Sequence, residues 1–183
     1  MPRQRPGLAA PTVLSPEGRH QSVRVIIETP KGSRNKYAYN EDLRAFELKK
    51  VLPAGMAFPY DFGFVPGTKG GDGDPLDVLV LMDEPAFTGC VLNCRLIGII
   101  KGEQKPAKGP KVENDRVVAV EVNTHSMAAI TELEDLGKEF VQELEQFFVN
   151  YHGLDGEDYR IIDDQGRKAA RRCLKHALQT ARR

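Results

Sequence analysis

Residues 67–80 read GTKGGDGDPLDVLV, a turn rich in glycine and aspartate that leads directly into an apolar run. The run, residues 76–82, is short, rich in branched side chains and bounded by turn residues, which is typical of a β-strand. The glycines allow unusual backbone angles, and Pro75 stiffens the turn before the strand. This stretch therefore predicts a rigid acidic loop at the mouth of a strand.

Further strands are predicted on both sides of this loop. They are expected at residues 22–28, 35–40, 44–52, 90–100 and 116–122, joined by turns rich in glycine and proline. Residues 102–110, GEQKPAKGP, show no pattern and are expected to form a polar loop. Strands first and helices last favour an α+β fold that is mainly β, with a small closed or half-open barrel flanked by helices.

The last third of the chain changes to helical periodicity. Thr131 offers an N-cap, and acidic residues follow it in the first turn. Apolar residues recur at helical spacing over residues 133–151, which predicts a first helix there. A second helix is expected over about residues 165–182, where alanines and a cysteine share one stripe.

Length and composition exclude several classes of protein. The 183 residues fit one domain, expected at residues 21–183 after a flexible arm at residues 1–20. Basic and acidic residues balance at 26 each, so charge gives no case for a nucleic-acid or membrane partner. No apolar run approaches the roughly 18 residues that span a bilayer, and proline and glycine interrupt the stretch that a secretory signal needs. Three cysteines do not make a disulfide framework, so a cytoplasmic protein is the default expectation.

Three carboxylates crowd the acidic loop. Asp72, Asp74 and Asp77 fall within six residues, and carboxylates at contact distance repel by about 1 kcal/mol per pair even in water. Such a cluster is usually fully solvated or binds a cation, and carboxylates suit hard cations, above all Mg²⁺ or Mn²⁺. A solvated surface turn is the simpler alternative, because aspartate and glycine are both turn residues.

Two other loop motifs do not fit. A calcium EF-hand counted from Asp72 has Leu76 at position 5 and Asp77 at position 6, where glycine is needed. A phosphate-binding P-loop fails as well, because no Gly-Lys-Ser/Thr follows the glycines.

The loop resembles a known signature. Residues 72–77, DGDPLD, are similar to the D-x-D-P-x-D pattern of the soluble family I inorganic pyrophosphatases. Other segments that resemble this family are residues 25–30 with 36–37, 58–64, 89–100, 117–120 and 147–151, so the likeness covers roughly residues 22–178. The resemblance implies an OB-like five-stranded β-barrel flanked by two C-terminal helices, and a homo-oligomer, expected to be a hexamer. It also implies hydrolysis of pyrophosphate to two phosphates with several Mg²⁺ ions.

The resemblance also implies roles for single residues. Asp74 would be the general base beside a metal-bound water. The implied metal ligands are Asp72, Asp77, Glu28, Asn114 and Asp115. The implied phosphate-binding residues are Lys36, Lys50, Arg116, Tyr151 and His152. Each of these residue types also occurs as a plain solvated or core residue, and only their joint appearance around the loop favours a site.

Several positions depart from the family pattern. Lys50 stands where the family usually has an arginine, so the charge is kept but the bidentate fork is lost. Phe62 stands where the family has a tyrosine, so a hydroxyl donor is missing. His152 stands where the family has a lysine, so this donor can be uncharged at neutral pH.

The segment 101–117 departs most. The family places two metal-binding aspartates there, followed by a lysine. Aligned from the strand at residue 117, Asn114 takes the second aspartate position and Arg116 takes the lysine position. Candidates for the remaining ligands are Glu103, Gln104, Glu113 and Asp115. The additional metal sites are therefore expected to bind weakly, unless lysines of the insert replace a cation: Lys105, Lys108 and Lys111.

The leading interpretation is a Mg²⁺-dependent inorganic pyrophosphatase of altered efficiency. One alternative is an enzyme of the same fold that acts on another phosphoanhydride. Another is a catalytically silent relative that binds metal or phosphate. The retention of three mutually repelling aspartates speaks against the silent form.

Overall fold

The computed structural model describes residues 11, 14–19 and 22–182. The flexibility expected of the arm at residues 1–20 therefore lies largely outside the described residues. In the described part of this arm, Glu17 forms an isolated bridge with Val23, and the carbonyl of Pro16 accepts a hydrogen bond from Arg24 N at 2.8 Å. Within the described residues, no helix combines the length and the apolar character needed to cross a membrane.

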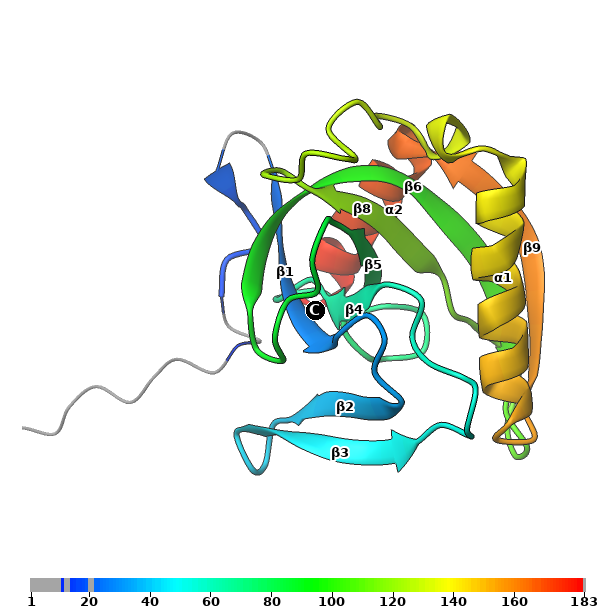
Figure 1. The fold of residues 1–183 in the computed structure, drawn as a ribbon. Coiled ribbons are helices and arrows are strands. Elements are labelled where there is room, and N and C mark those ends of the chain that lie inside the picture. Colours follow the sequence, from blue (N-terminus) through cyan, green and yellow to red (C-terminus); the bar gives the residue numbers. More distant parts are fainter. Residues whose placement is uncertain (1–10, 12–13, 20–21, 183) are drawn as a thin grey trace, which may run out of the picture.

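Within the described residues, five strands close into a ring (Figure 1). They are β1 (Val23–Thr29), β4 (Asp61–Phe64), β5 (Asp77–Leu81), β8 (Arg116–Glu121) and β6 (Val91–Lys105). In that order each strand pairs with the next, and β6 returns to pair with β1. All these pairs are antiparallel except β5 with β8. The prediction of a mainly β, OB-like five-stranded barrel is confirmed.

The apolar run after the acidic loop forms β5, as predicted. Its four residues from Val78 to Leu81 are fully buried, and so are their neighbours Val117 to Val120 on β8. Alternate residues face opposite sides of the strands: Val78 and Val80 pack in one core, and Leu79 and Leu81 pack in the two clusters on the other side. A strand that is covered on both faces needs a continuous apolar sequence rather than an alternating one.

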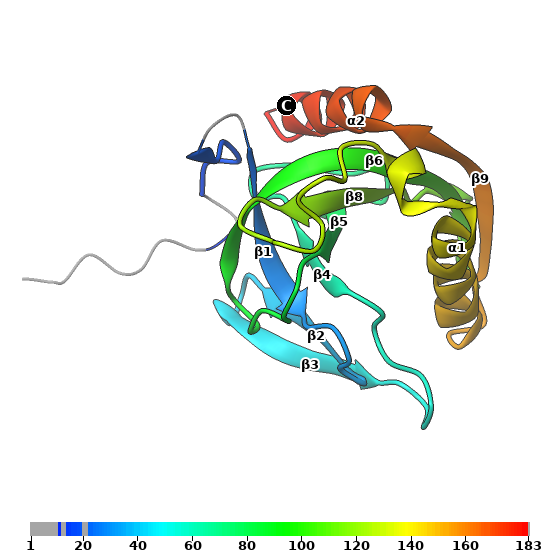
Figure 2. The same ribbon diagram turned by 45° about the horizontal axis from the view of Figure 1, so that its top comes forward.

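Two helices cover the ring on different sides (Figure 2). The helix α2 (Arg167–Thr180) packs Ala170 and Ala177 against the core that contains Val78 and Val80. The helix α1 (Lys138–Gly153) packs against the other face of the strands and lies beside β9 (Asp158–Gly166). Both predicted helices are therefore present.

A separate hairpin flanks the ring. Its strands are β2 (Asn35–Asn40) and β3 (Ala45–Val51), which form their own two-stranded sheet. The register places Lys36 opposite Lys50, so two cationic side chains start from neighbouring positions of this sheet.

The first predicted helix begins later than expected. Residues 133–136 form a short 3₁₀ turn, η3 (Leu133–Leu136), and α1 starts only after Gly137. Gly137 has a φ of 83°, in the left-handed region, and this angle interrupts the helix. The N-cap of this turn is Glu132 rather than the predicted Thr131, and the carboxylate of Asp135 accepts hydrogen bonds from the backbone of Thr131 and Glu132, so the acidic residues serve the short turn instead of α1.

The polar segment after β6 is also more ordered than predicted. Residues 102–105 continue β6 and pair with β9, which has no predicted counterpart. A two-residue strand, β7 (Val112–Glu113), pairs with the same end of β6, so the loop proper is confined to residues 106–111. The extension was missed because strands that are partly solvated on both faces need no hydrophobic alternation.

Candidate functional site

The acidic loop opens into a cavity of about 870 Å³, which also touches the β2–β3 hairpin and the C-terminal turn of α1. The predicted site residues that line it are Glu28, Lys36, Asp72, Asp74, Asp77, Asn114, Arg116, Tyr151 and His152. Lys50 lies beside the cavity, with Nζ 2.5 Å from Asp155 and 3.9 Å from the centre of the Tyr151 ring. Most of the predicted site is thus brought together from six separate segments of the chain.

The loop is held by hydrogen bonds within itself, from both backbone and side chains. Gly70 N donates to Asp74 O at 2.6 Å, and Asp74 N donates to the carboxylate of Asp72 at 3.1 Å. The hydroxyl of Thr68 accepts a hydrogen bond from Leu76 N at 2.9 Å, which ties the end of the loop to the start of β5. The loop thus lies at the start of β5, as the sequence predicted, and internal hydrogen bonds define its course.

The loop also crowds three carboxylates, and this changes the pKa values of Asp72 and Asp74. Burial raises the pKa of both Asp72 and Asp74, and the neighbouring charge of Asp77 raises each pKa further. Partly desolvated carboxylates that repel one another fit a hard divalent cation, which would relieve both effects. Among the described residues, however, no three carboxylate, thiol or imidazole groups are already gathered around one point, so a cation would have to draw these side chains together.

Arg116 supplies a fixed positive charge beside the acidic loop. It starts β8, which runs parallel to β5, and this register brings its Nη1 to 2.7 Å from Asp77 Oδ2. The same nitrogen donates to the side-chain oxygen of Asn114. Arg116 is only 4% exposed, and its guanidinium lies 5.3 Å from the centre of the Phe148 ring. Asp77 is therefore already partnered by a buried cation.

Glu28 at the end of β1 and Lys36 in β2 influence each other electrostatically. Burial raises the pKa of Glu28 to about 7, although the charge of Lys36 and a hydrogen bond from Tyr39 N act in the opposite direction. Burial lowers the pKa of Lys36, whose Nζ lies 4.3 Å from the centre of the Phe62 ring. Phe62, where a hydroxyl is missing, thus offers its aromatic face to this lysine.

The raised pKa of Glu28 predicts a pH-dependent stability. In the metal-free protein, Glu28 ionises near pH 4.5 in the unfolded chain but only near pH 7 in the folded one, so the free energy of unfolding should fall by about 3 kcal/mol between these two pH values. Glu28→Gln should remove this part of the decline, because the amide is neutral at every pH. Urea unfolding of both proteins at pH 5 and pH 8 in a chelator measures the difference. Equal declines would contradict the prediction.

His152 is enclosed at the end of α1. Its ring is stacked on Tyr159 with centroids 4.5 Å apart and planes 14° apart. Nδ1 lies 3.0 Å from Glu157 Oε2, and Nε2 lies 3.4 Å from Arg116 Nη2. Burial lowers the pKa of this imidazole.

Three partners of this part of the site were not predicted to have a role: Asp155, Glu157 and Tyr159. The hydroxyl of Tyr159 donates to Asn114 O at 2.8 Å, which fixes the backbone before Arg116. Glu157 Oε2 also accepts a hydrogen bond from Gln104 at 2.7 Å. These residues lie in and just before β9, where no hydrophobic pattern marks them, so the sequence offers no signal that would have found them.

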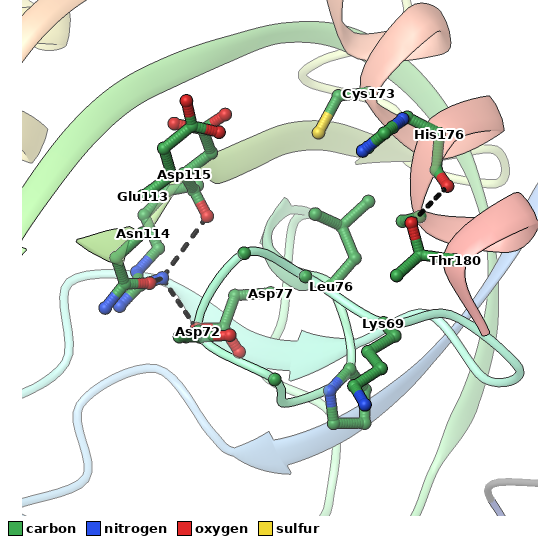
Figure 3. Close-up of a pocket in the computed structure, with 16 residues that line it drawn as sticks. Lys69, Asp72, Leu76, Asp77, Glu113, Asn114, Asp115, Cys173, His176 and Thr180 are labelled. Carbon is green, nitrogen blue, oxygen red and sulfur yellow. Dashed lines mark hydrogen bonds and ion pairs between the residues drawn. The ribbon is translucent and has the colours of Figure 1, made fainter. Parts of the chain in front are cut away.

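Asp115 lies on the other side of the loop. It lines a second pocket of about 400 Å³ between the acidic loop and α2, and it does not line the larger cavity. Figure 3 shows Glu113 and Asp115 facing Cys173 and His176 of α2 across this pocket. The carboxylate of Asp115 accepts a hydrogen bond from Gly102 N at 3.2 Å, and burial raises its pKa. Asp115 thus shares the second pocket with the predicted ligands Asp72, Asp77 and Asn114, whereas Glu28 and Asp74 line only the larger cavity.

The chain is similar to a well-defined group of proteins. A family model described as inorganic pyrophosphatase matches residues 25–182. A curated inorganic pyrophosphatase of Haloferax volcanii is 33% identical over 161 residues, covering 85% of this chain and 86% of the relative. That of Thermus thermophilus is 36% identical over 151 residues, covering 81% of this chain and 83% of the relative.

Solved structures give the same picture. The crystal structure of inorganic pyrophosphatase from Thermus thermophilus has a TM-score of 0.86 and 32% identity, and the match covers 96% of this chain and all of that one (100%). An inorganic pyrophosphatase from Neisseria gonorrhoeae has a TM-score of 0.83 and 29% identity, covering 93% of this chain and 98% of that one. The similarity therefore includes the ring, both helices and the segments that form the cavity.

Proposed function

The chain belongs to the inorganic pyrophosphatase family and is a metal-dependent hydrolase of pyrophosphate, and we propose which of its residues carry out the reaction. The observation that supports the proposal is the meeting of three aspartates with Lys36, Arg116 and Tyr151 in one cavity. Acidic groups for cations and basic groups for phosphates are what a tetra-anionic substrate requires.

We propose that the cation is Mg²⁺, with Mn²⁺ as a substitute, because both are hard cations that prefer oxygen ligands. The residues that would hold it are Asp72, Asp77 and Glu28, with Asn114 as a neutral oxygen donor. Asp115 would contribute only from the neighbouring pocket. When bound, such cations neutralise the charge of pyrophosphate and lower the pKa of a bound water molecule.

Asp74 is the proposed general base. It lines the cavity, and its raised pKa brings its basicity closer to the operating pH, which favours proton transfer. It would take a proton from the attacking water as the water oxygen bonds to one phosphorus atom. The bond from that phosphorus to the bridging oxygen breaks at the same time, and the bridging oxygen leaves with the second phosphate.

The phosphate groups would be held by the basic and hydroxyl groups of the opposite wall. Lys36 and Arg116 carry charge into the cavity from β2 and β8, and Tyr151 offers its hydroxyl from α1. Lys50, which lies over the Tyr151 ring, would add charge at the edge. These groups would stabilise the charge that develops on the departing phosphate.

The reaction is tested by phosphate release from pyrophosphate with and without Mg²⁺. Chelation should abolish release, and added Mg²⁺ or Mn²⁺ should restore it, because the carboxylates of the acidic loop repel the anionic substrate unless a cation lies between them. Other phosphoanhydrides, such as tripolyphosphate, serve as the comparison. Release confined to one of these would show a shifted substrate, and no release with either cation would favour a silent protein.

We further propose a cytoplasmic location and a homo-oligomer, expected to be a hexamer. Large apolar side chains that are exposed in the single chain are compatible with assembly, among them Phe87 at 71% and Val51 at 55%. The mass of the purified protein in solution, measured by light scattering, decides between a monomer and an assembly.

A further inference from the structure

We propose that His152 is a positioning residue, which as a neutral imidazole accepts a hydrogen bond from Arg116 and holds that guanidinium against Asp77. The contact itself is independent of the reaction, but its kinetic consequence rests on the function proposed above. This role differs from the expectation that His152 binds phosphate directly.

The imidazole ring has one well-defined orientation. His152 is 5% exposed, and one face of its ring is stacked on Tyr159. The Tyr151 ring meets it edge-on, with the two ring centroids 5.2 Å apart. Within the part of the chain that the structure describes, each ring nitrogen has one partner, Glu157 at Nδ1 and Arg116 at Nε2. The ring is therefore held by packing before either hydrogen bond is considered.

The chemistry of arginine decides where the proton lies. A guanidinium carries donors only and stays charged at any pH that a folded protein meets. Nε2 of His152, 3.4 Å from Arg116 Nη2, must therefore be the acceptor. The ring proton then lies on Nδ1, from which it is donated to Glu157 at 3.0 Å. A doubly protonated ring would place an N–H against an N–H of Arg116 and two positive charges side by side.

The contact completes a closed circuit of hydrogen bonds around Arg116. Arg116 donates to the side chain of Asn114, and the amide of Asn114 donates to Gln104. Gln104 donates to Glu157 at 2.7 Å, and Glu157 is the partner of His152. The guanidinium is thus fixed from two sides while its Nη1 meets Asp77 at 2.7 Å. Since Asp77 lies in the acidic loop, His152 sets the distance between this cation and the loop.

The surroundings keep the ring neutral near pH 7. The charged or titratable groups that face it are Glu157 before β9, Arg116 on β8, Lys50 on β3, Tyr159 on β9 and Tyr151 on α1. Burial lowers the pKa of His152 most, the hydrogen bond to Glu157 opposes this, and the charges of Arg116 and Lys50 lower it further.

Nitrogen NMR of the full-length protein with Mg²⁺ tests the contact without any kinetic measurement. The ring of His152 should show a protonated Nδ1 and an unprotonated Nε2 between pH 8 and pH 7. Its signals are assigned by their loss in His152→Gln, or, should that variant not fold, by elimination with variants of the other histidines. A proton on Nε2 at pH 7, either in the neutral Nε2–H tautomer or in the doubly protonated ring, would overturn the proposal.

Two matched variants test the consequence. His152→Gln places an amide oxygen near the position of Nε2 and can still accept from Arg116, whereas the shorter His152→Asn reaches only the position of Nδ1. We expect kcat/KM for pyrophosphate to fall about tenfold in His152→Asn, mainly through KM, and less than threefold in His152→Gln. Equal losses in two folded variants, or no loss in either, would contradict a positioning role. Wild-type protein without activity would instead refute the proposed function, and the NMR result would still decide the contact.

Discussion

Asp74→Asn is expected to lower kcat for phosphate release by a factor of about 10² to 10⁴, the usual contribution of a positioned general base. Asparagine has the same shape and leaves the backbone bond from Gly70 to residue 74 in place, but it cannot accept a proton at neutral pH. The KM for pyrophosphate should change little, because the phosphate-binding groups lie on other elements. Initial rates at saturating Mg²⁺ give both constants.

A matched control is available in the same protein. Asp42 is exposed in the turn between β2 and β3 and does not line the cavity, so Asp42→Asn makes the same chemical change outside the site and should leave kcat unaltered. If Asp74→Asn kept its activity within threefold of the wild type, another group would have to be the base. The pH dependence of kcat would then identify that group by its pKa.

Asp77→Asn is expected to weaken both Mg²⁺ binding and folding. Arg116 would keep its buried charge but lose its only carboxylate partner within the described residues, which should lower the free energy of unfolding by about 2 kcal/mol. The proposed cation site would lose one of its charged ligands at the same time. Urea unfolding without metal measures the first effect, and calorimetric titration with Mg²⁺ measures the second.

A double-mutant cycle separates the two roles of Asp77. Arg116→Gln alone, Asp77→Asn alone and the double variant give the coupling energy of the pair. If the two losses in the free energy of unfolding simply add, the 2.7 Å contact between Arg116 and Asp77 does not stabilise the fold. If the double variant binds Mg²⁺ more weakly than Arg116→Gln alone, Asp77 binds the cation directly.

Much of the site could be predicted because its acidic half is local in sequence. Asp72, Asp74 and Asp77 share one stiff turn, so their proximity needs no long-range contact. The partners of this loop are different, since Arg116 reaches Asp77 only because β8 lies parallel beside β5. The resemblance placed Arg116 and His152 at the site, but it could not show that they bond to each other.

The sequence by itself determined the strands with apolar runs, the two helices and the acidic loop, because burial and turn chemistry act over a few neighbouring residues. It did not determine β4, β9, the extension of β6 or the break at Gly137. A strand of four residues such as β4 is too short to show a period, and the polar strand β9 shows no hydrophobic alternation. A single residue in the left-handed region stops a helix while the apolar spacing on both sides of it continues. Only the tertiary structure decided that Asp115 faces the second pocket and that Glu157, Gln104 and His152 enclose Arg116. The physical reason is that hydrogen bonds between distant segments depend on strand register, and register is set by the pairing of the whole ring.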